Sequence, residues 1–153
     1  VGHPRLLPIQ SAQKEKMKTF VDAGPRRALV SQRDQWHQKT LQILKTLQTP
    51  NINLITTDYI IDEVFTGLLG LKTTGRHRIQ ELSNFIFDKS EIIIEWITKE
   101  RFFETKRKFL KFSKDKDWSF TDCTSYVVMK ELGIKTAFTF DENFRDMGFS
   151  VLE

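Results

Sequence analysis

Short apolar runs of strand length alternate along this chain with longer stretches that have a helical period. Ile92-Ile93-Ile94 is the clearest run, and such unbroken apolar segments are typical of strands that a parallel sheet buries on both faces. The other runs are residues 19–21, 54–55, 137–140 and 150–152. Strands that alternate with helices join through right-handed crossovers. The pattern predicts an α/β fold with a parallel sheet of about five strands.

Apolar residues recur every three or four positions between these runs, which indicates amphipathic helices. The first expected helix begins at Pro25, continues to about Gln48 and ends before Pro50 and Asn51. Gly133 is expected to close a later helix as its C-terminal cap. The other expected helices lie at residues 58–70, 76–87, 119–132 and 142–147, with a basic helix around residues 102–112.

The length of 153 residues suits one domain. Residues 1–16 contain two prolines and no sustained period, and we expect a flexible tail there before a single domain at residues 17–153. No apolar run approaches the roughly 20 residues of a transmembrane helix, and no secretory signal is evident. Cys123 is the single cysteine, which excludes an internal disulfide. We therefore expect a cytoplasmic protein with no membrane partner.

The net charge of +4 comes from 24 basic and 20 acidic residues. The segment 99–117 holds eight basic and four acidic residues, so its excess equals the whole net charge. A smaller basic group surrounds the loop at residues 72–78. Two interpretations stay open for these residues: a solvated helix face with ion pairs one turn apart, or a surface for a nucleic acid.

Four acidic residues are expected to meet at one edge of the predicted sheet. Asp22 ends the first strand and Asp141 ends the fourth. The helix that starts near Asp122 descends about 18 Å, and the next strand climbs back about 16 Å, so Asp122 and Asp141 return to the same edge. Glu63 lies near the start of a helix, where side chains lean toward the N-terminus. This carboxyl edge is where open α/β sheets bind ligands.

Gathered carboxylates repel one another unless a cation or bound protons compensate them, and a hard divalent ion with oxygen ligands is the natural compensator. The three histidines are scattered and lack the spacing of a zinc site. Each acid also has a simpler interpretation. Asp22 could be a turn residue, Asp122 could favour the helix dipole, Asp141 could cap a helix, and Glu63 could be solvated.

The sequence from residue 18 onward resembles the PIN-domain ribonucleases, and among them the VapC-like toxins of prokaryotic toxin–antitoxin pairs. Four segments carry the resemblance: Phe20-Val21-Asp22, residues 56–63 ending in Glu63, Ser119-Phe120-Thr121-Asp122-Cys123, and Ala137-Phe138-Thr139-Phe140-Asp141-Glu142-Asn143-Phe144. The last two are the more specific. One departure is Ala23-Gly24-Pro25, because members of the family usually place Ser or Thr soon after the first aspartate. The implied fold has three layers, α/β/α.

The resemblance implies a metal-dependent endoribonuclease that acts as a toxin. Asp22, Glu63, Asp122 and Asp141 would be the catalytic and metal-binding residues for one or two Mg²⁺ or Mn²⁺ ions, with Thr121 in support. Partners implied by the family are the RNA substrate, a protein antitoxin and a second copy in a homodimer. Candidate contacts to the RNA backbone are Arg76, Arg78, Lys106, Arg107, Lys108 and Lys111.

Two alternatives stay open. A catalytically silent PIN-like module that binds RNA or protein is compatible with the missing hydroxyl after Asp22. A phospho-accepting receiver-like domain also places carboxylates at strand ends, but it would have paired acids after the first strand and a lysine at the end of the last. Here Asp22 stands alone and Lys135 precedes the fourth strand.

Overall fold

The computed structural model describes residues 15–30, 33, 35, 37–47, 49–70, 75–88 and 92–152. Its sheet has five strands in the order β3-β2-β1-β4-β5, and every pair is parallel. The strands are β1 (Met17–Val21), β2 (Ile52–Thr57), β3 (Ile92–Glu95), β4 (Thr136–Phe138) and β5 (Ser150–Leu152). The predicted parallel five-stranded sheet is confirmed.

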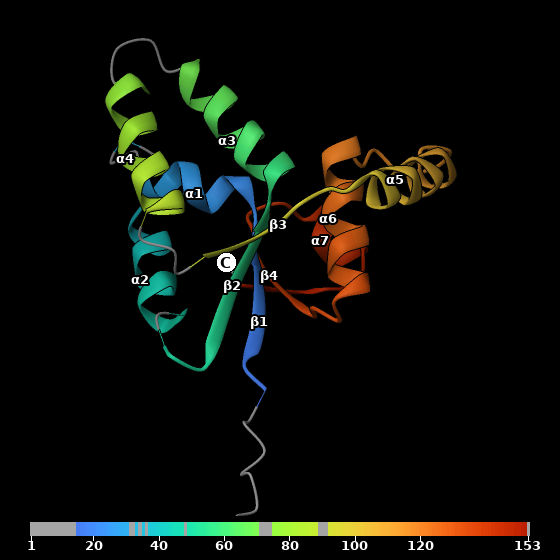
Figure 1. Cartoon of the computed structure of the whole chain (residues 1–153), viewed down its shortest axis with the longest axis horizontal. Coiled ribbons are helices and arrows are strands. Elements are labelled where there is room, and N and C mark those ends of the chain that lie inside the picture. Colours follow the sequence, from blue (N-terminus) through green and yellow to red (C-terminus); the bar gives the residue numbers. More distant parts are fainter. Residues whose placement is uncertain are drawn as a thin grey trace, which may run out of the picture.

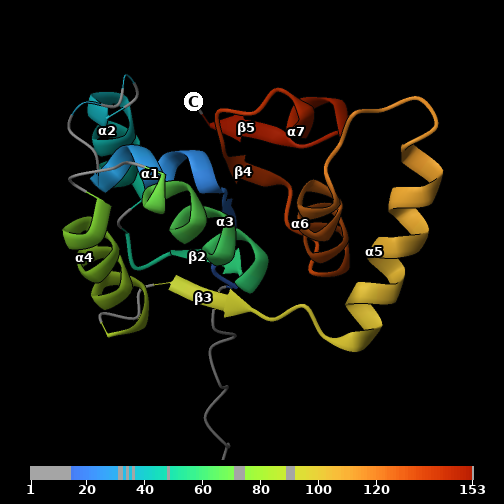
Figure 2. The same cartoon turned by 90° about the horizontal axis from the view of Figure 1, so that it is seen from above.

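Helices cover both faces of this sheet and complete a three-layer α/β/α arrangement (Figure 1). The helices are α1 (Ala23–Val30), α2 (His37–Leu47), α3 (Asp58–Leu69), α4 (Gly75–Phe87), α5 (Lys99–Phe112), α6 (Phe120–Glu131) and α7 (Asn143–Asp146). The first four lie on one side and the last three on the other, with α5 on the outside of α6 (Figure 2). Among the described residues, none of these helices combines the length and apolar character that crossing a bilayer requires.

The single helix predicted between Pro25 and Gln48 is wrong, because the structure has two helices there. The first begins at Ala23, directly after β1, and Arg33 lies in a turn between the two. The sequence between the two helices begins with five polar residues, Ser-Gln-Arg-Asp-Gln at 31–35, which weakens the apolar period of a continuous helix. His37 at the start of α2 contacts the carbonyl of Ala28 through Nδ1 at 2.7 Å, which fixes the angle between the helices.

The predicted end of α6 is confirmed in detail. Gly133 has a φ of +66°, the left-handed conformation that favours glycine. The Gly133 N–H donates to the carbonyl of Lys130 at 3.3 Å, and the Ile134 N–H donates to the carbonyl of Met129 at 2.8 Å. These two bonds satisfy carbonyls that the helix end would leave free. The chain is thereby turned into β4, which returns it to the carboxyl edge of the sheet.

Apolar side chains from both faces of the sheet fill the core. The strand runs supply Phe20, Ile55 and Phe138, and the helices supply residues such as Val64 and Phe144; all five are at most 2% exposed. Burial of a large apolar side chain stabilises the fold by about 1.5–3 kcal/mol. The interior therefore holds the strand ends, and the residues that follow them, in fixed positions.

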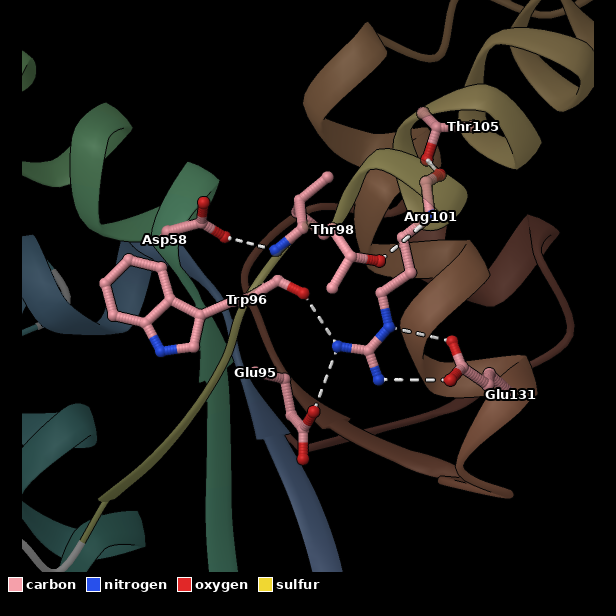
Figure 3. Close-up of polar contacts among 8 residues, drawn as sticks. Asp58, Glu95, Trp96, Thr98, Arg101, Thr105 and Glu131 are labelled. Carbon is pink, nitrogen blue, oxygen red and sulfur yellow. Dashed lines mark hydrogen bonds and ion pairs between the residues drawn. The ribbon is translucent and has the colours of Figure 1, made fainter.

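Arg101 on α5 connects the end of β3, the loop that follows it and helix α6 (Figure 3). Its guanidinium donates to Glu95 at the end of β3 at 3.0 Å, to the carbonyl of Trp96 at 2.8 Å, and to both carboxylate oxygens of Glu131 on α6 at 2.8 and 3.2 Å. Asp58 on α3 accepts the N–H of Ile97 from the same connection at 2.8 Å. The crossover from β3 to α5 is thus anchored to α3 and α6, the helices that carry Glu63 and Asp122.

Replacing Arg101 by alanine is expected to lower the free energy of unfolding by about 1–2 kcal/mol, because the variant loses the donor of four hydrogen bonds and leaves two carboxylates without their partner. Arg107→Ala is the matched control on the same helix, since Arg107 pairs only with Glu104 at the exposed surface. Urea denaturation should separate the two variants. Equal losses of stability would contradict the anchoring role of Arg101.

Candidate functional site

The candidate site lies where the order of strands reverses, between β1 and β4. The sequence runs outward from β1 to β2 and β3, and then from β4 to β5 on the other side. The crevice beyond the carboxyl ends at such a reversal is the usual ligand site of open α/β sheets. Asp22 follows β1 directly, and Asp141 lies three residues beyond β4. The structure therefore brings both to the predicted edge.

Asp22 is held in place from β4. Its backbone N–H donates to the carbonyl of Phe138 at 3.0 Å, and the hydroxyl of Thr139 donates to its carboxylate Oδ2 at 2.6 Å. Its side chain is buried, with 9% of the residue exposed. A buried carboxylate with few donors is poorly compensated, so its ionisation is sensitive to the charges around it.

Burial raises the pKa of Asp22 from its ordinary value of 3.8 to about 6. The hydrogen bond from Thr139 and one from the backbone of Ala23 act in the opposite direction. The negative charges of Glu63 and Asp122 raise the pKa of Asp22 further. Three of the four predicted acids thus share one electrostatic environment, and Asp22 is its most buried member.

Asp122 is the third residue of a capping box at the start of α6. The hydroxyl of Ser119 accepts the Asp122 N–H at 3.0 Å, and Asp122 Oδ2 accepts the Ser119 N–H at 2.9 Å. Burial raises the pKa of Asp122, and the charge of Asp141 adds to this effect, while bonds from Ser119 and the Asn143 side chain lower it. Asp122 therefore caps helix α6 and also belongs to the group of acidic residues at the sheet edge.

Thr139 links Asp22 to Asp141, a role that we did not predict from the sequence. Its hydroxyl oxygen accepts the backbone N–H of Asp141 at 3.0 Å while its proton is donated to Asp22. Asp141 in turn accepts the backbone N–H of Asn143 through Oδ1 at 2.9 Å. The only sequence signal for Thr139 is a hydroxyl residue inside an apolar run, two positions before an aspartate.

Glu63 and Thr121 occupy the outer part of the site. Glu63 lies on the exposed side of α3, and its charge reaches Asp22. Thr121 is half-buried, and its carbonyl accepts the hydroxyls of Thr124 and Ser125 at 2.6 and 3.3 Å. These bonds stabilise the first turns of α6. That the Thr121 side chain supports a carboxylate or a water stays a prediction.

The candidate metal ligands at this edge are of the chemical type that a hard divalent cation prefers. All four are carboxylates, and the charges of neighbouring members raise the pKa of Asp22 and of Asp122. As they stand, no three acidic, histidine or cysteine side chains of the described residues enclose a common point for an ion. Mg²⁺ does not need such a cage, because it keeps several waters and takes one or two carboxylates directly. The set therefore fits an ion held partly through water.

The predicted RNA-contacting residues differ in how freely their charges face solvent. Arg78 pairs with Glu81 at 3.1 Å, and Arg107 pairs with Glu104 at 2.7 Å. The ammonium of Lys108 lies 6.0 Å from the centre of the Tyr126 ring, and that of Lys111 lies 5.9 Å from the centre of the Phe112 ring. Lys106 is exposed. The side chain of Arg76 lies outside the described part of the structure.

A family model for the PIN domain matches residues 25–150 of the chain. No curated protein matches it in sequence. Among solved structures, VapC20 of Mycobacterium tuberculosis, a toxin that cleaves the sarcin–ricin loop, is 24% identical with a TM-score of 0.75, over 86% of this chain and 95% of VapC20.

Two further solved structures have the same fold at lower identity. VapBC2 of Rickettsia felis, solved with a DNA fragment from its promoter, is 13% identical with a TM-score of 0.62, over 89% of this chain and 98% of the other. FitAcB of Neisseria gonorrhoeae is 13% identical with a TM-score of 0.62, over 88% of this chain and 96% of the other. The likeness at these identities shows a shared fold.

Asp22→Asn is expected to stabilise the metal-free protein at pH 7 by about 2–3 kcal/mol, because a raised pKa means that burial opposes the ionised carboxylate. At the acid end of the range, near pH 3.5, the aspartate is mostly protonated in both folded and unfolded chains, so the gain should become small there. Between pH 4 and 6 the wild-type stability should fall as pH rises, and the variant should lack this contribution. Urea denaturation in chelator across pH 3.5–7.5 measures this; a variant less stable than wild type at pH 7 would contradict it.

Proposed function

The chain belongs to the PIN-domain family, and from this premise we propose that it is a divalent-metal-dependent endoribonuclease of the VapC toxin type. The observation that carries the proposal is the meeting of Asp22 and Asp141 at neighbouring strand ends, with burial and the charges of nearby acids raising the pKa of Asp22 and of Asp122. Such an arrangement opposes folding unless a cation or bound protons compensate it. Membership of this family leaves the receiver-like alternative without support.

The four carboxylates would hold Mg²⁺ or Mn²⁺, some directly and some through water. A bound ion would supply an activated water and stabilise the charge that develops on the phosphate and the leaving oxygen. Thr139 orients Asp22 by donating to Oδ2. The Ser119 cap fixes Asp122 in the same way through Oδ2. These bonds preorganise the acids before any ion binds.

The missing Ser or Thr after Asp22 has a structural counterpart in Thr139. Ala23 has no hydroxyl, but Thr139 presents one to the Asp22 carboxylate from the neighbouring strand end. Orientation of Asp22 therefore does not depend on a hydroxyl at position 23. This supports activity over the silent-module alternative, which predicts no cleavage by the folded protein in the presence of metal.

The similar solved structures suggest a substrate and partners, which we propose for this chain. A sarcin–ricin loop RNA is the first substrate to test, because VapC20 cleaves that loop. An antitoxin protein that covers the acidic edge is proposed because similar folds occur in VapBC and FitAB assemblies. A homodimer is proposed as well, and exposed apolar side chains such as Trp96 and Phe103 offer surface for a protein contact.

Asp122→Asn is expected to reduce Mn²⁺-dependent cleavage of RNA by about 100-fold or more, because the variant removes a charged ligand from the site. The asparagine carbonyl can still accept the Ser119 N–H, so the helix cap and the fold should persist. Asp117→Asn, an exposed loop aspartate nearby, is the matched control and should keep its activity. Cleavage rates on a defined RNA, with Mn²⁺ and with chelator, measure the effect. Undiminished cleavage by folded Asp122→Asn would overturn the proposal.

Lys106→Gln combined with Lys111→Gln is expected to weaken RNA binding and to make it less dependent on salt, because phosphate contacts release counterions. Binding of a fluorescent RNA in chelator, at several salt concentrations, gives the slope. Lys135→Gln, an exposed lysine before β4, is the control. An unchanged slope in the double variant would exclude Lys106 and Lys111 as phosphate contacts.

A further inference from the structure

Helices α5 and α6 lie side by side on the outside of the sheet (Figure 2), and a groove of about 880 Å³ lies between them. This volume is in the range of sites that bind small molecules. The ionisable side chains that line the groove carry both signs of charge: Glu100, Glu104, Glu131, Arg101, Lys108 and Lys130. The partners of these side chains decide which kind of ligand the groove can take.

Two of the acidic side chains in the groove are already held by arginines. Arg101 donates to both carboxylate oxygens of Glu131 at 2.8 and 3.2 Å (Figure 3). Arg107, on the outer side of α5, donates to both carboxylate oxygens of Glu104 at 3.0 and 2.7 Å. Such two-pronged pairs are the strongest that arginine makes with a carboxylate. The two glutamates are therefore not available to the lysines of the groove.

The lysines of the groove have no carboxylate partner. Among the described residues, neither Lys108 nor Lys130 makes an ion pair within 4 Å. The third acid, Glu100, precedes Lys108 by eight residues on α5, which is about 12 Å along the helix axis. The end of the groove that holds Lys108 and Lys130 is therefore positively charged.

Tyr126 on α6 brings the two lysines to one place. The ammonium of Lys108 lies 6.0 Å from the centre of the Tyr126 ring, and that of Lys130 lies 5.6 Å from the same centre. A ring offers no oxygen acceptor, so the three N–H donors of each ammonium stay available to a ligand. The Tyr126 hydroxyl has no hydrogen-bond partner among the described residues either. Two cations and a hydroxyl donor thus surround one point of the groove.

This point lies close to the acidic edge along α6. Tyr126 follows Asp122 by one helical turn and Lys130 follows it by two, which is about 6 and 12 Å along the axis. Residues four apart lie on the same side of a helix. A nucleic acid strand with one phosphate at Asp122 therefore has further phosphates within reach of Lys108 and Lys130.

We propose that this end of the groove binds phosphate groups, with Lys108 and Lys130 as the cations and the Tyr126 hydroxyl as a hydrogen-bond donor. Lysine binds phosphate as a point charge, and a phosphate has enough oxygens to accept from several donors at once. The backbone of the RNA that is cut at the acidic edge supplies these phosphates, so the inference rests on the proposed function. The three residues position the strand and take no part in the chemical step.

Binding of a fluorescent single-stranded RNA in chelator, at several salt concentrations, tests the inference without cleavage. The groove variant, Lys108→Gln combined with Lys130→Gln, should bind on the order of tenfold more weakly. Its slope of log affinity against log salt should fall by about 1.4, because each phosphate contact with a single strand contributes about 0.7. The control variant, Lys45→Gln combined with Lys135→Gln, removes two exposed lysines outside the groove and should bind like wild type.

Two further measurements separate a built site from a diffuse charge. Tyr126→Phe keeps the ring and removes the hydroxyl, so RNA should bind about threefold more weakly with an unchanged salt slope. Titration with inorganic phosphate, followed by amide NMR, should shift the signals of Tyr126 and Lys130 in wild type and in the control variant, and not in the groove variant. Circular dichroism and urea denaturation verify the fold of each protein.

The outcomes decide between the possible ligands. Weaker binding and a lower slope in the groove variant alone support the RNA backbone as the ligand. Equal RNA binding by all variants, with a phosphate response that only the groove variant lacks, overturns the RNA backbone in favour of a free phosphate ligand. Equal behaviour of the groove and control variants in both titrations overturns the site. A wild type that binds RNA through the groove and cleaves none with Mn²⁺ overturns the proposed function and leaves the site standing.

Discussion

Burial of carboxylates at the carboxyl ends of β1 and β4, with repulsion among them, is the constraint on which the rest of the site depends. The strand order places Asp22 and Asp141 on neighbouring strand ends, and the helices that enter and leave the sheet add Glu63 and Asp122. Burial and, to a smaller extent, neighbouring negative charges raise the pKa of Asp22 and of Asp122, so both carboxylates oppose folding at neutral pH. A protein that keeps them together gains from a cation at that edge.

The surrounding structure holds this unfavourable group in place with few bonds. Thr139 bonds to Asp22, 117 positions earlier in the sequence, and to the backbone of Asp141, and the Ser119 capping box fixes a third acid at the start of α6. The large apolar core around Phe20 and Phe138 supplies the stability that the acidic edge opposes. Arg101 then fixes α6 to the end of β3.

The sequence allows the sheet and the meeting of the acids to be predicted, because both follow from short-range patterns and strand geometry. Apolar runs mark strands wherever they are buried on both faces, and an acid after a strand is carried to a known edge. Other features depend on contacts between distant segments. The Thr139 bond requires the register of β4 against β1. The break between α1 and α2 is hard to predict because the polar residues 31–35 also suit an exposed helix face.

Anomalous diffraction from crystals soaked in Mn²⁺ is the most direct test of the account. The account predicts an anomalous peak at the carboxyl edge of β1 and β4, with Asp22 or Asp141 in direct contact and the other acids near enough to act through water. Thr139 should keep its bond to Asp22 beside the ion. A well-ordered structure with no peak at this edge, or with Mn²⁺ bound only elsewhere on the surface, would contradict it.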